Sequence, residues 1–168
     1  MKKNITIALL LVLTLLIGIT IGRFISPVKE TLIENEIEKI VEVKSPTAGL
    51  AKKYLSKFID TQEQVNNLPH NEQEYQTTIG MRELASQEYE MWDTLLNEVY
   101  SELKNILSTE DMDNLTNLQI QWISDRDTIA ETAGKKAEGG TLQPLLITTS
   151  KSQTTKERCL ELINDYMN

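Results

Sequence analysis

The sequence has almost nothing with which to build a covalent crosslink or a metal centre. It contains one cysteine, Cys159, and one histidine, His70, in 168 residues. A single cysteine excludes an intrachain disulfide and a cysteine cluster for zinc. His70 lies in a polar segment without the HExxH spacing of zinc proteases, so we interpret it as a solvated loop residue. We therefore predict neither a metal nor a cofactor.

Glycine, proline and aromatic residues are also sparse, with seven glycines, four prolines and 5% aromatics. A β sandwich needs many turns rich in Gly and Pro, so this balance favours helices. Basic residues are outnumbered, and from Leu50 onward we count 11 Lys+Arg and 20 Asp+Glu, a net charge of 11 − 20 = −9. Such a surface excludes unaided binding of nucleic acid. It would attract a basic partner, or it would simply keep the domain soluble.

Motifs of known catalytic sites are missing. There is no G-x-S-x-G, no glycine-rich phosphate loop and no Ser/His/Asp combination on plausible elements. Glu88 and Glu98 could serve as a pair of glycosidase carboxylates, but in a sequence this acidic such pairs arise by chance. We therefore predict no catalytic residues and a binding or structural module rather than an enzyme.

One long apolar run is present, from Ile5 to Gly22 without a charge. As a helix it would rise about 27 Å, which is close to the hydrocarbon thickness of a bilayer. We predict an uncleaved, single-pass membrane anchor over residues 1–25, with a cleaved signal as the alternative. Lys2 and Lys3 favour a cytoplasmic N-terminus and a domain outside the cytoplasm.

Residues 26–47 are predicted to form a stalk or linker. Ile33, Ile37 and Ile40 fall on one narrow helical stripe, which is typical of a short stalk helix that could pair as a dimer. The stretch Ile40–Val43 could instead be extended. Ser45-Pro46-Thr47 breaks the pattern and marks the predicted boundary of a helical domain over residues 48–168.

Four helices are predicted in this domain, so the fold class is all-α with an up-down helical arrangement. They run from Leu50 to about Leu68, from Thr77 to about Leu107, from the N-cap Ser108 to the glycines 139–140, and from the N-cap Thr141 onward. Because the connection at Ser108 is so short, the second and third helices should form a long antiparallel hairpin. The segment Thr148–Thr155 is polar, so the last helix should be partly exposed or frayed there.

Polar residues interrupt the apolar stripe of the third helix, where Gln119 and Arg126 flank Trp122. A half-buried guanidinium needs a partner, because an unpaired buried charge is costly. If the hairpin packs antiparallel about its turn, Arg126 lies opposite the stretch from Glu90 to Asp93. We predict an ion pair between Arg126 and one of these two carboxylates.

These residues have two readings, since they could fix the register of the hairpin or form one wall of a binding groove. The candidate partner-binding residues in this region are Asp93, Asn97, Tyr100, Gln119, Trp122, Arg126 and Asp127. A second candidate is the glycine loop, residues 138–143, which could enter a partner's cleft or could be a plain helix connection. Its candidate residues are Glu138, Gly139, Gly140 and Thr141.

The same residues carry a family resemblance over residues 81–162. The motifs are Asp93-x-x-Leu96-Asn97-x-x-Tyr100, Gln119-x-x-Trp122-x-x-x-Arg126-Asp127, Gly139-Gly140-Thr141 and Thr155-x-x-Arg158-x-x-x-Leu162. In order and spacing this segment resembles the small domain of lysozyme inhibitor LprI-like proteins of the bacterial envelope. The family usually carries cysteines where this chain has Leu84, Ala130 and Ser150. The helices of this chain must therefore hold together by packing alone.

The resemblance implies a helical extracytoplasmic domain. We expect a module anchored in the cell membrane that binds, and could inhibit, lysozyme or another enzyme that cleaves the cell wall. The expected partner is a basic protein such as a lysozyme, which an acidic domain would steer toward itself. The alternative is a non-inhibitory scaffold or sensor domain for another envelope protein.

Overall fold

The structure, a computed structural model, describes residues 48–167, and all regular elements in this range are helical. The helices are α2 (Ala48–Asn66), α3 (Thr78–Ile106), α4 (Thr109–Gly134) and α5 (Gln143–Tyr166), with 3₁₀ turns η1 (Gln73–Gln76) and η2 (Lys135–Ala137). The predicted all-α class is therefore confirmed for this part of the chain. No helix within it is long and apolar enough to cross a membrane.

The predicted anchor and stalk lie outside the described residues. The membrane helix over residues 1–25, the stalk over residues 26–47 and its pairing as a dimer therefore stay predictions, and so do the proposed domain limits.

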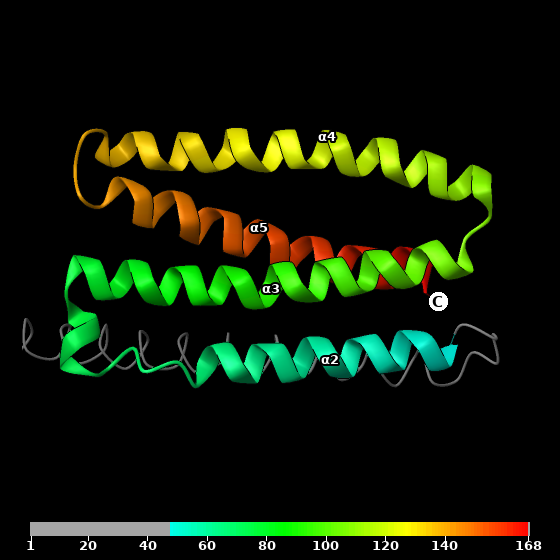
Figure 1. Cartoon of the computed structure of the whole chain (residues 1–168), viewed down its shortest axis with the longest axis horizontal. Coiled ribbons are helices and arrows are strands. Elements are labelled where there is room, and N and C mark those ends of the chain that lie inside the picture. Colours follow the sequence, from blue (N-terminus) through cyan, green and yellow to red (C-terminus); the bar gives the residue numbers. More distant parts are fainter. Residues whose placement is uncertain (1–47, 168) are drawn as a thin grey trace, which may run out of the picture. The chain divides into compact units, whose positions relative to one another are not determined.

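Helix α5 is the centre of the described domain (Figure 1). It runs between α3 and α4 and packs against both, while α2 packs against α3 and α5. The turn at Leu107 and Ser108 reverses the chain as predicted, so that α3 and α4 are antiparallel. The prediction that these two helices pack directly on each other is wrong, because α5 fills most of the space between them and leaves few direct contacts.

The core explains why α5 can lie so close to α3. Ser152, Thr155 and Cys159 are fully buried on α5, and small side chains allow close packing of helices; Cys159 contacts α3 at the carbonyl of Trp92. Trp92 of α3 is also fully buried, and its ring centroid lies 5.0 Å from that of Phe58 on α2. The stretch Thr148–Thr155 was predicted to be partly exposed or frayed. It is not frayed, because α5 is continuous there, but it is partly exposed, since Thr149 and Gln153 are exposed while Ser152 and Thr155 are buried.

Cys159 is a fully buried core residue. Its thiol donates a hydrogen bond to the backbone carbonyl of Trp92, with the sulfur 3.5 Å from the oxygen. Burial, with a further contribution from the charge of Asp93, raises the pKa of the Cys159 thiol. A buried thiol that stays protonated is a poor nucleophile, so Cys159 serves packing.

Two of the predicted helix starts are confirmed by their caps. The hydroxyl of Ser108 accepts a hydrogen bond from the backbone N–H of Asp111 at 3.1 Å and so begins α4. Thr77 caps α3 in the same way. The prediction that Thr141 caps the last helix is wrong, because α5 begins two residues later, with Pro144 in its first turn and no side-chain cap.

Candidate functional site

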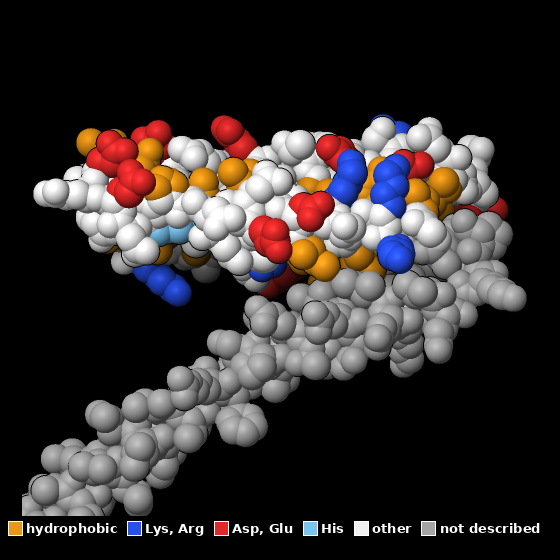
Figure 2. Space-filling model, turned by 90° about the horizontal axis from the view of Figure 1, so that it is seen from below, with side chains coloured by type: hydrophobic (Ala, Val, Ile, Leu, Met, Phe, Trp, Pro, Cys, Tyr) orange, Lys and Arg blue, Asp and Glu red, His pale blue; other side chains and the backbone are white. Residues whose placement is uncertain are grey.

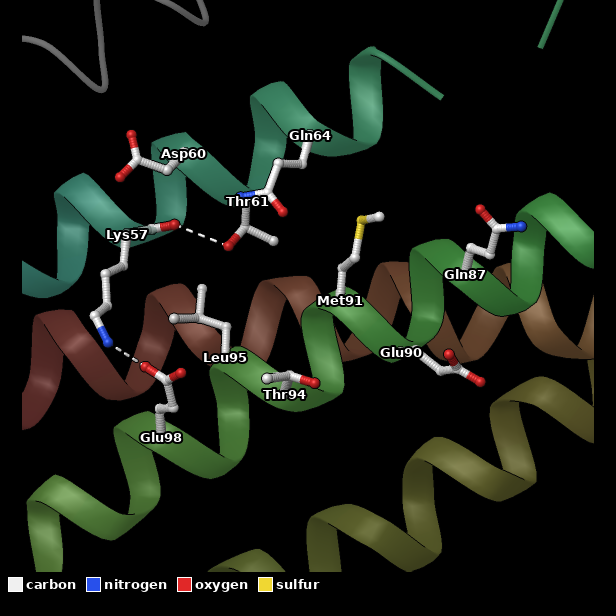
Figure 3. A pocket seen from close by; sticks show the side chains of 10 residues that line it. All are labelled: Lys57, Asp60, Thr61, Gln64, Gln87, Glu90, Met91, Thr94, Leu95 and Glu98. Carbon is white, nitrogen blue, oxygen red and sulfur yellow. Dashed lines mark hydrogen bonds and ion pairs between the residues drawn. The ribbon is translucent and has the colours of Figure 1, made fainter. Parts of the chain in front are cut away.

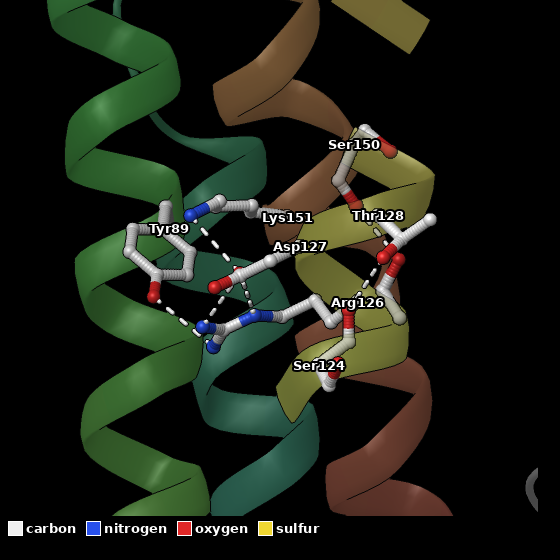
Figure 4. Close-up of polar contacts among 8 residues, drawn as sticks. Tyr89, Ser124, Arg126, Asp127, Thr128, Ser150 and Lys151 are labelled. Carbon is white, nitrogen blue, oxygen red and sulfur yellow. Dashed lines mark hydrogen bonds and ion pairs between the residues drawn. The ribbon is translucent and has the colours of Figure 1, made fainter. Parts of the chain in front are cut away.

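Arg126 is the centre of a polar cluster that joins three helices (Figure 4). Its side chain is 11% exposed, and its Nη1 donates a hydrogen bond to the hydroxyl of Tyr89 on α3 at 3.2 Å. Its Nε and Nη2 lie 3.1 and 3.0 Å from Oδ1 of Asp127 on α4. The same oxygen lies 3.0 Å from Nζ of Lys151 on α5. The cluster therefore connects α3, α4 and α5.

The charges of this cluster favour one protonation state. Burial raises the pKa of the Asp127 carboxyl, but hydrogen bonds and charge interactions with Lys151 and Arg126 outweigh it and hold the pKa below its usual range. Asp127 is therefore ionised across physiological pH and accepts bonds from two cations. Such charge-assisted bonds are short and directional, so the cluster holds its helices in one register.

The predicted ion pair between Arg126 and Glu90 or Asp93 is wrong. Arg126 pairs instead with its chain neighbour Asp127 and contacts α3 at Tyr89, through the hydroxyl and the face of the ring. The reason is the position of α5, which separates α3 from α4. Across this wider gap the long side chain of Tyr89 meets the guanidinium.

Trp122 lies beside two guanidinium groups. The Cζ atoms of Arg126 and Arg158 lie over the Trp122 ring, 5.2 and 5.8 Å from its centroid. Arg158 is itself buried, donates from Nε to Oε1 of Gln119 at 3.0 Å and pairs with Glu161 at 2.9 Å. Both arginines are thus held by other groups while they cover the indole. This arrangement makes Trp122 a rigid, half-buried ring on α4.

Sequence reasoning missed Arg158 as a site residue, although it is part of the fourth motif of the resemblance. The pattern that could have indicated Arg158 is a basic residue on the same side of α5 as the buried residues Thr155 and Leu162. Lys151 and Tyr89 were also missed, because each becomes a partner only when α5 and α3 are placed beside α4.

The other predicted residues of α3 do not join the cluster. Asn97 donates hydrogen bonds to the backbone carbonyl and the carboxylate of Asp93, one turn earlier, at 2.8 and 3.0 Å. The hydroxyl of Tyr100 lies 3.0 Å from that of Thr116 on α4 and so connects the two helices. The structure therefore brings Gln119, Trp122, Arg126 and Asp127 together and leaves Asp93 and Asn97 apart from them.

The predicted glycine loop is exposed, at the end of the pair formed by α4 and α5 (Figure 1). Gly139 has a φ of 72°, a conformation that side chains disfavour, and its N–H donates to Oε1 of Gln143 at 2.9 Å. The N–H of Gly140 donates to the carbonyl of Ala137 at 2.9 Å. Glu138 and Thr141 are exposed beside them, so the loop is a compact turn with accessible side chains.

A groove of about 520 Å³ lies between α2 and α3 (Figure 3). An ion pair between Lys57 and Glu98 joins the two helices there. The lining residues are Lys57, Asp60, Thr61, Gln64, Gln87, Glu90, Met91, Thr94, Leu95 and Glu98. The sequence did not predict this groove, because its two walls come from different helices.

The groove also bears on the hydrolase alternative. Glu98 lines it and Glu88 does not. Ten residues of helix separate the two positions by about 15 Å along the axis, whereas glycosidase carboxylates lie roughly 5–9.5 Å apart. Glu88 and Glu98 therefore do not form a two-carboxylate centre. Within residues 48–167, no group of three or more His, Cys, Asp or Glu is placed to hold a metal ion.

The chain also matches a known protein family. The family model described as lysozyme inhibitor LprI matches residues 70–162, which is 93 of the 168 residues and spans α3, α4 and most of α5. The resemblance drawn from the motifs is thereby confirmed. No match was found among curated proteins or among solved structures.

Proposed function

This chain belongs to the lysozyme inhibitor LprI family, and on that premise we propose that its helical domain binds and inhibits a lysozyme or another enzyme that cleaves the bacterial cell wall. The observation that carries the proposal is the family match over α3, α4 and α5. We propose further that Ile5–Gly22 anchors the chain in the cell membrane and that the domain lies outside the cytoplasm.

Electrostatics support a basic partner. The chain from Leu50 onward carries a net charge of 11 − 20 = −9. Long-range attraction of this kind raises the rate of encounter with a cationic protein and falls as salt is added. Lysozymes are often basic, so an acidic domain near the cell wall would meet them quickly.

The polar cluster supports a role in binding rather than in catalysis. The charged groups of Arg126, Asp127 and Lys151 bond to one another and leave no free acid or base among them. Their bonds connect three helices, so they stiffen the domain before a partner arrives. A surface that is already ordered loses little conformational entropy on binding.

A turbidity assay tests the proposal. A soluble fragment of residues 45–168, checked for helicity by circular dichroism, is mixed with several lysozymes and a suspension of cell walls. We expect clearing to slow in proportion to the fragment, and less so at high salt. An unrelated protein of equal size and net charge serves as the control. If the suspension clears at the normal rate with every lysozyme, even at a large molar excess of fragment, the proposal is wrong.

A second candidate function is a non-inhibitory scaffold or sensor for another envelope protein. The observation that favours it is the groove, because one of its walls is α2, which lies outside the matched residues 70–162. Crosslinking in cells to a non-lytic partner, together with unchanged lysozyme sensitivity of a deletion strain, would support this function over inhibition.

A further inference from the structure

Exposed apolar side chains gather on α4. Eight large hydrophobic residues are exposed among the described residues, and half of them belong to this one helix. The four are Leu118, Ile120, Ile123 and Ile129. Single exposed apolar residues need no explanation, but exposed apolar side chains that share one face mark an interaction site. Leu118 and Ile129 share a face of α4, whereas Ile120 and Ile123 lie on the opposite side of the helix. Helix α4 is also covered on fewer sides than α3, because it packs mainly on α5 and the turn η2.

One face of α4 combines Leu118 and Ile129 with the half-buried Trp122. Leu118, Trp122, Asp125 and Ile129 are spaced i, i+4, i+7 and i+11, so they share a face of the helix, which we name the Leu118–Ile129 stripe. Leu118 is 55% exposed and Ile129 is 53% exposed. The buried side of α4 is the neighbouring stripe of Leu115, Gln119, Arg126 and Ala130.

Trp122 suits the centre of a binding surface. Tryptophan is the residue type most enriched among side chains that dominate binding energy. Here Arg126 and Arg158 lie over the ring, and Asp127 and Glu161 hold those arginines in place. The indole is therefore ordered before a partner arrives, between two exposed aliphatic side chains.

Charge decides what kind of partner fits this face. Helix α4 contains one Arg and six Asp+Glu, a net charge of 1 − 6 = −5. Helix α2 carries 3 − 2 = +1 and α5 carries 3 − 3 = 0. The face seen from the side of α2 accordingly shows lysine and acidic side chains together (Figure 2). If a second copy of the chain docked through α4, two helices that each carry a net charge of −5 would face and repel each other. The charge of α4 therefore favours a cationic protein as the partner.

We propose that the Leu118–Ile129 stripe is the surface through which this domain docks a basic enzyme that cleaves the cell wall. The proposal rests on the proposed function and adds the contact face. Leu118, Trp122 and Ile129 would pack against apolar surface of the enzyme, and the carboxylates around them, such as Asp125, would meet its basic rim. This is the usual arrangement of an apolar centre within a polar border.

The test compares two matched double variants of the full chain, purified in a nonionic detergent. One is Leu118→Ser with Ile129→Ser on the stripe. The other is Ile79→Ser with Ile106→Ser on α3, where the residues are 77% and 37% exposed. Both remove two exposed aliphatic side chains from a helix, so both should fold. Affinity for a basic lysozyme is measured by biolayer interferometry at low and high salt.

We expect the stripe variant to bind at least about tenfold more weakly and the α3 variant to stay within about twofold of the wild type. Asp125→Asn should mainly slow association at low salt. Equal affinity of the stripe variant and the wild type would overturn the docking surface and leave the inhibitory function standing. A wild-type chain that binds no lysozyme would overturn both. Loss of self-association in the stripe variant, with lysozyme binding intact, would assign the stripe to a second copy and overturn the proposal.

Discussion

Replacement of Arg126 by leucine should destabilise the domain by about 2–4 kcal/mol. The bond from the guanidinium to the Tyr89 hydroxyl is a hydrogen bond to a charged group, which contributes roughly 1.5–3 kcal/mol. Contact with the Trp122 ring adds about 0.5–1 kcal/mol. The ion pair with Asp127 adds little, because this carboxylate is 43% exposed and keeps Lys151 as a partner.

The measurement is urea and thermal unfolding of the fragment of residues 45–168, followed by far-ultraviolet circular dichroism. For a domain of this size the loss corresponds to a fall of roughly 6–15 °C in Tm. Arg126→Lys should lie between leucine and the wild type, because an ammonium keeps the charge but lacks the planar fork. Arg82→Leu, at an exposed position of α3, is the control and should change the stability by less than about 0.5 kcal/mol.

A double-mutant cycle locates the effect. Tyr89→Phe removes only the hydroxyl that Arg126 bonds, so the two substitutions should be coupled by roughly 1.5–3 kcal/mol, the contribution of that bond. The reasoning is refuted if Arg126→Leu unfolds at the same urea concentration as the wild type. It is also refuted if the stability losses of Arg126→Leu and Tyr89→Phe simply add in the double variant, because the cluster then does not hold the helices together.

Two further predictions concern packing and pH. In Gly134→Ala the new Cβ would lie 2.6 Å from Cγ1 of Ile147, so we expect a loss of about 1–3 kcal/mol in urea unfolding. Gly49→Ala is its control, because nothing lies within 4 Å of that Cβ and the domain should be unchanged or slightly stabilised. Burial, together with the hydrogen bond that Tyr54 donates to Glu102, raises the pKa of Tyr54 to about 12. Because an unfolded tyrosine ionises near pH 10, stability should fall as the pH rises from about 10 to 12, and Tyr54→Phe should lose less over that window. Equal losses in the two proteins would contradict this assignment.

Local features were readable from the sequence because they depend on residues a few positions apart. The start of α3 at Thr77 and of α4 at Ser108 follows from a hydroxyl that accepts from an N–H three residues later. The end of the first helix, predicted near Leu68 and found at Asn66, and the reversal between α3 and α4 are of the same kind. The family motifs were also recognisable, since residue type and spacing alone define them, and the match over residues 70–162 confirmed them.

The residues that replace the family's cysteines were predicted only in part from the sequence. Leu84 and Ala130 are buried, so an apolar residue occupies two of the three positions where the resemblance implies a cysteine, and the third, Ser150, is half-buried. The sequence could predict that packing replaces crosslinks here. It could not say which helices those residues face.

The order of the helices in space was decided by tertiary packing alone. Ser152 and Thr155 read as polar and exposed along the chain, yet both are fully buried on α5, which packs on α3 and on α4 and separates these two helices. That single placement moved the partner of Arg126 from the predicted Glu90 or Asp93 to Tyr89. The exposed stripe on α4 has the same origin. The steric fit of one face against another joins residues tens of positions apart, and helical periodicity carries no information about which faces will meet.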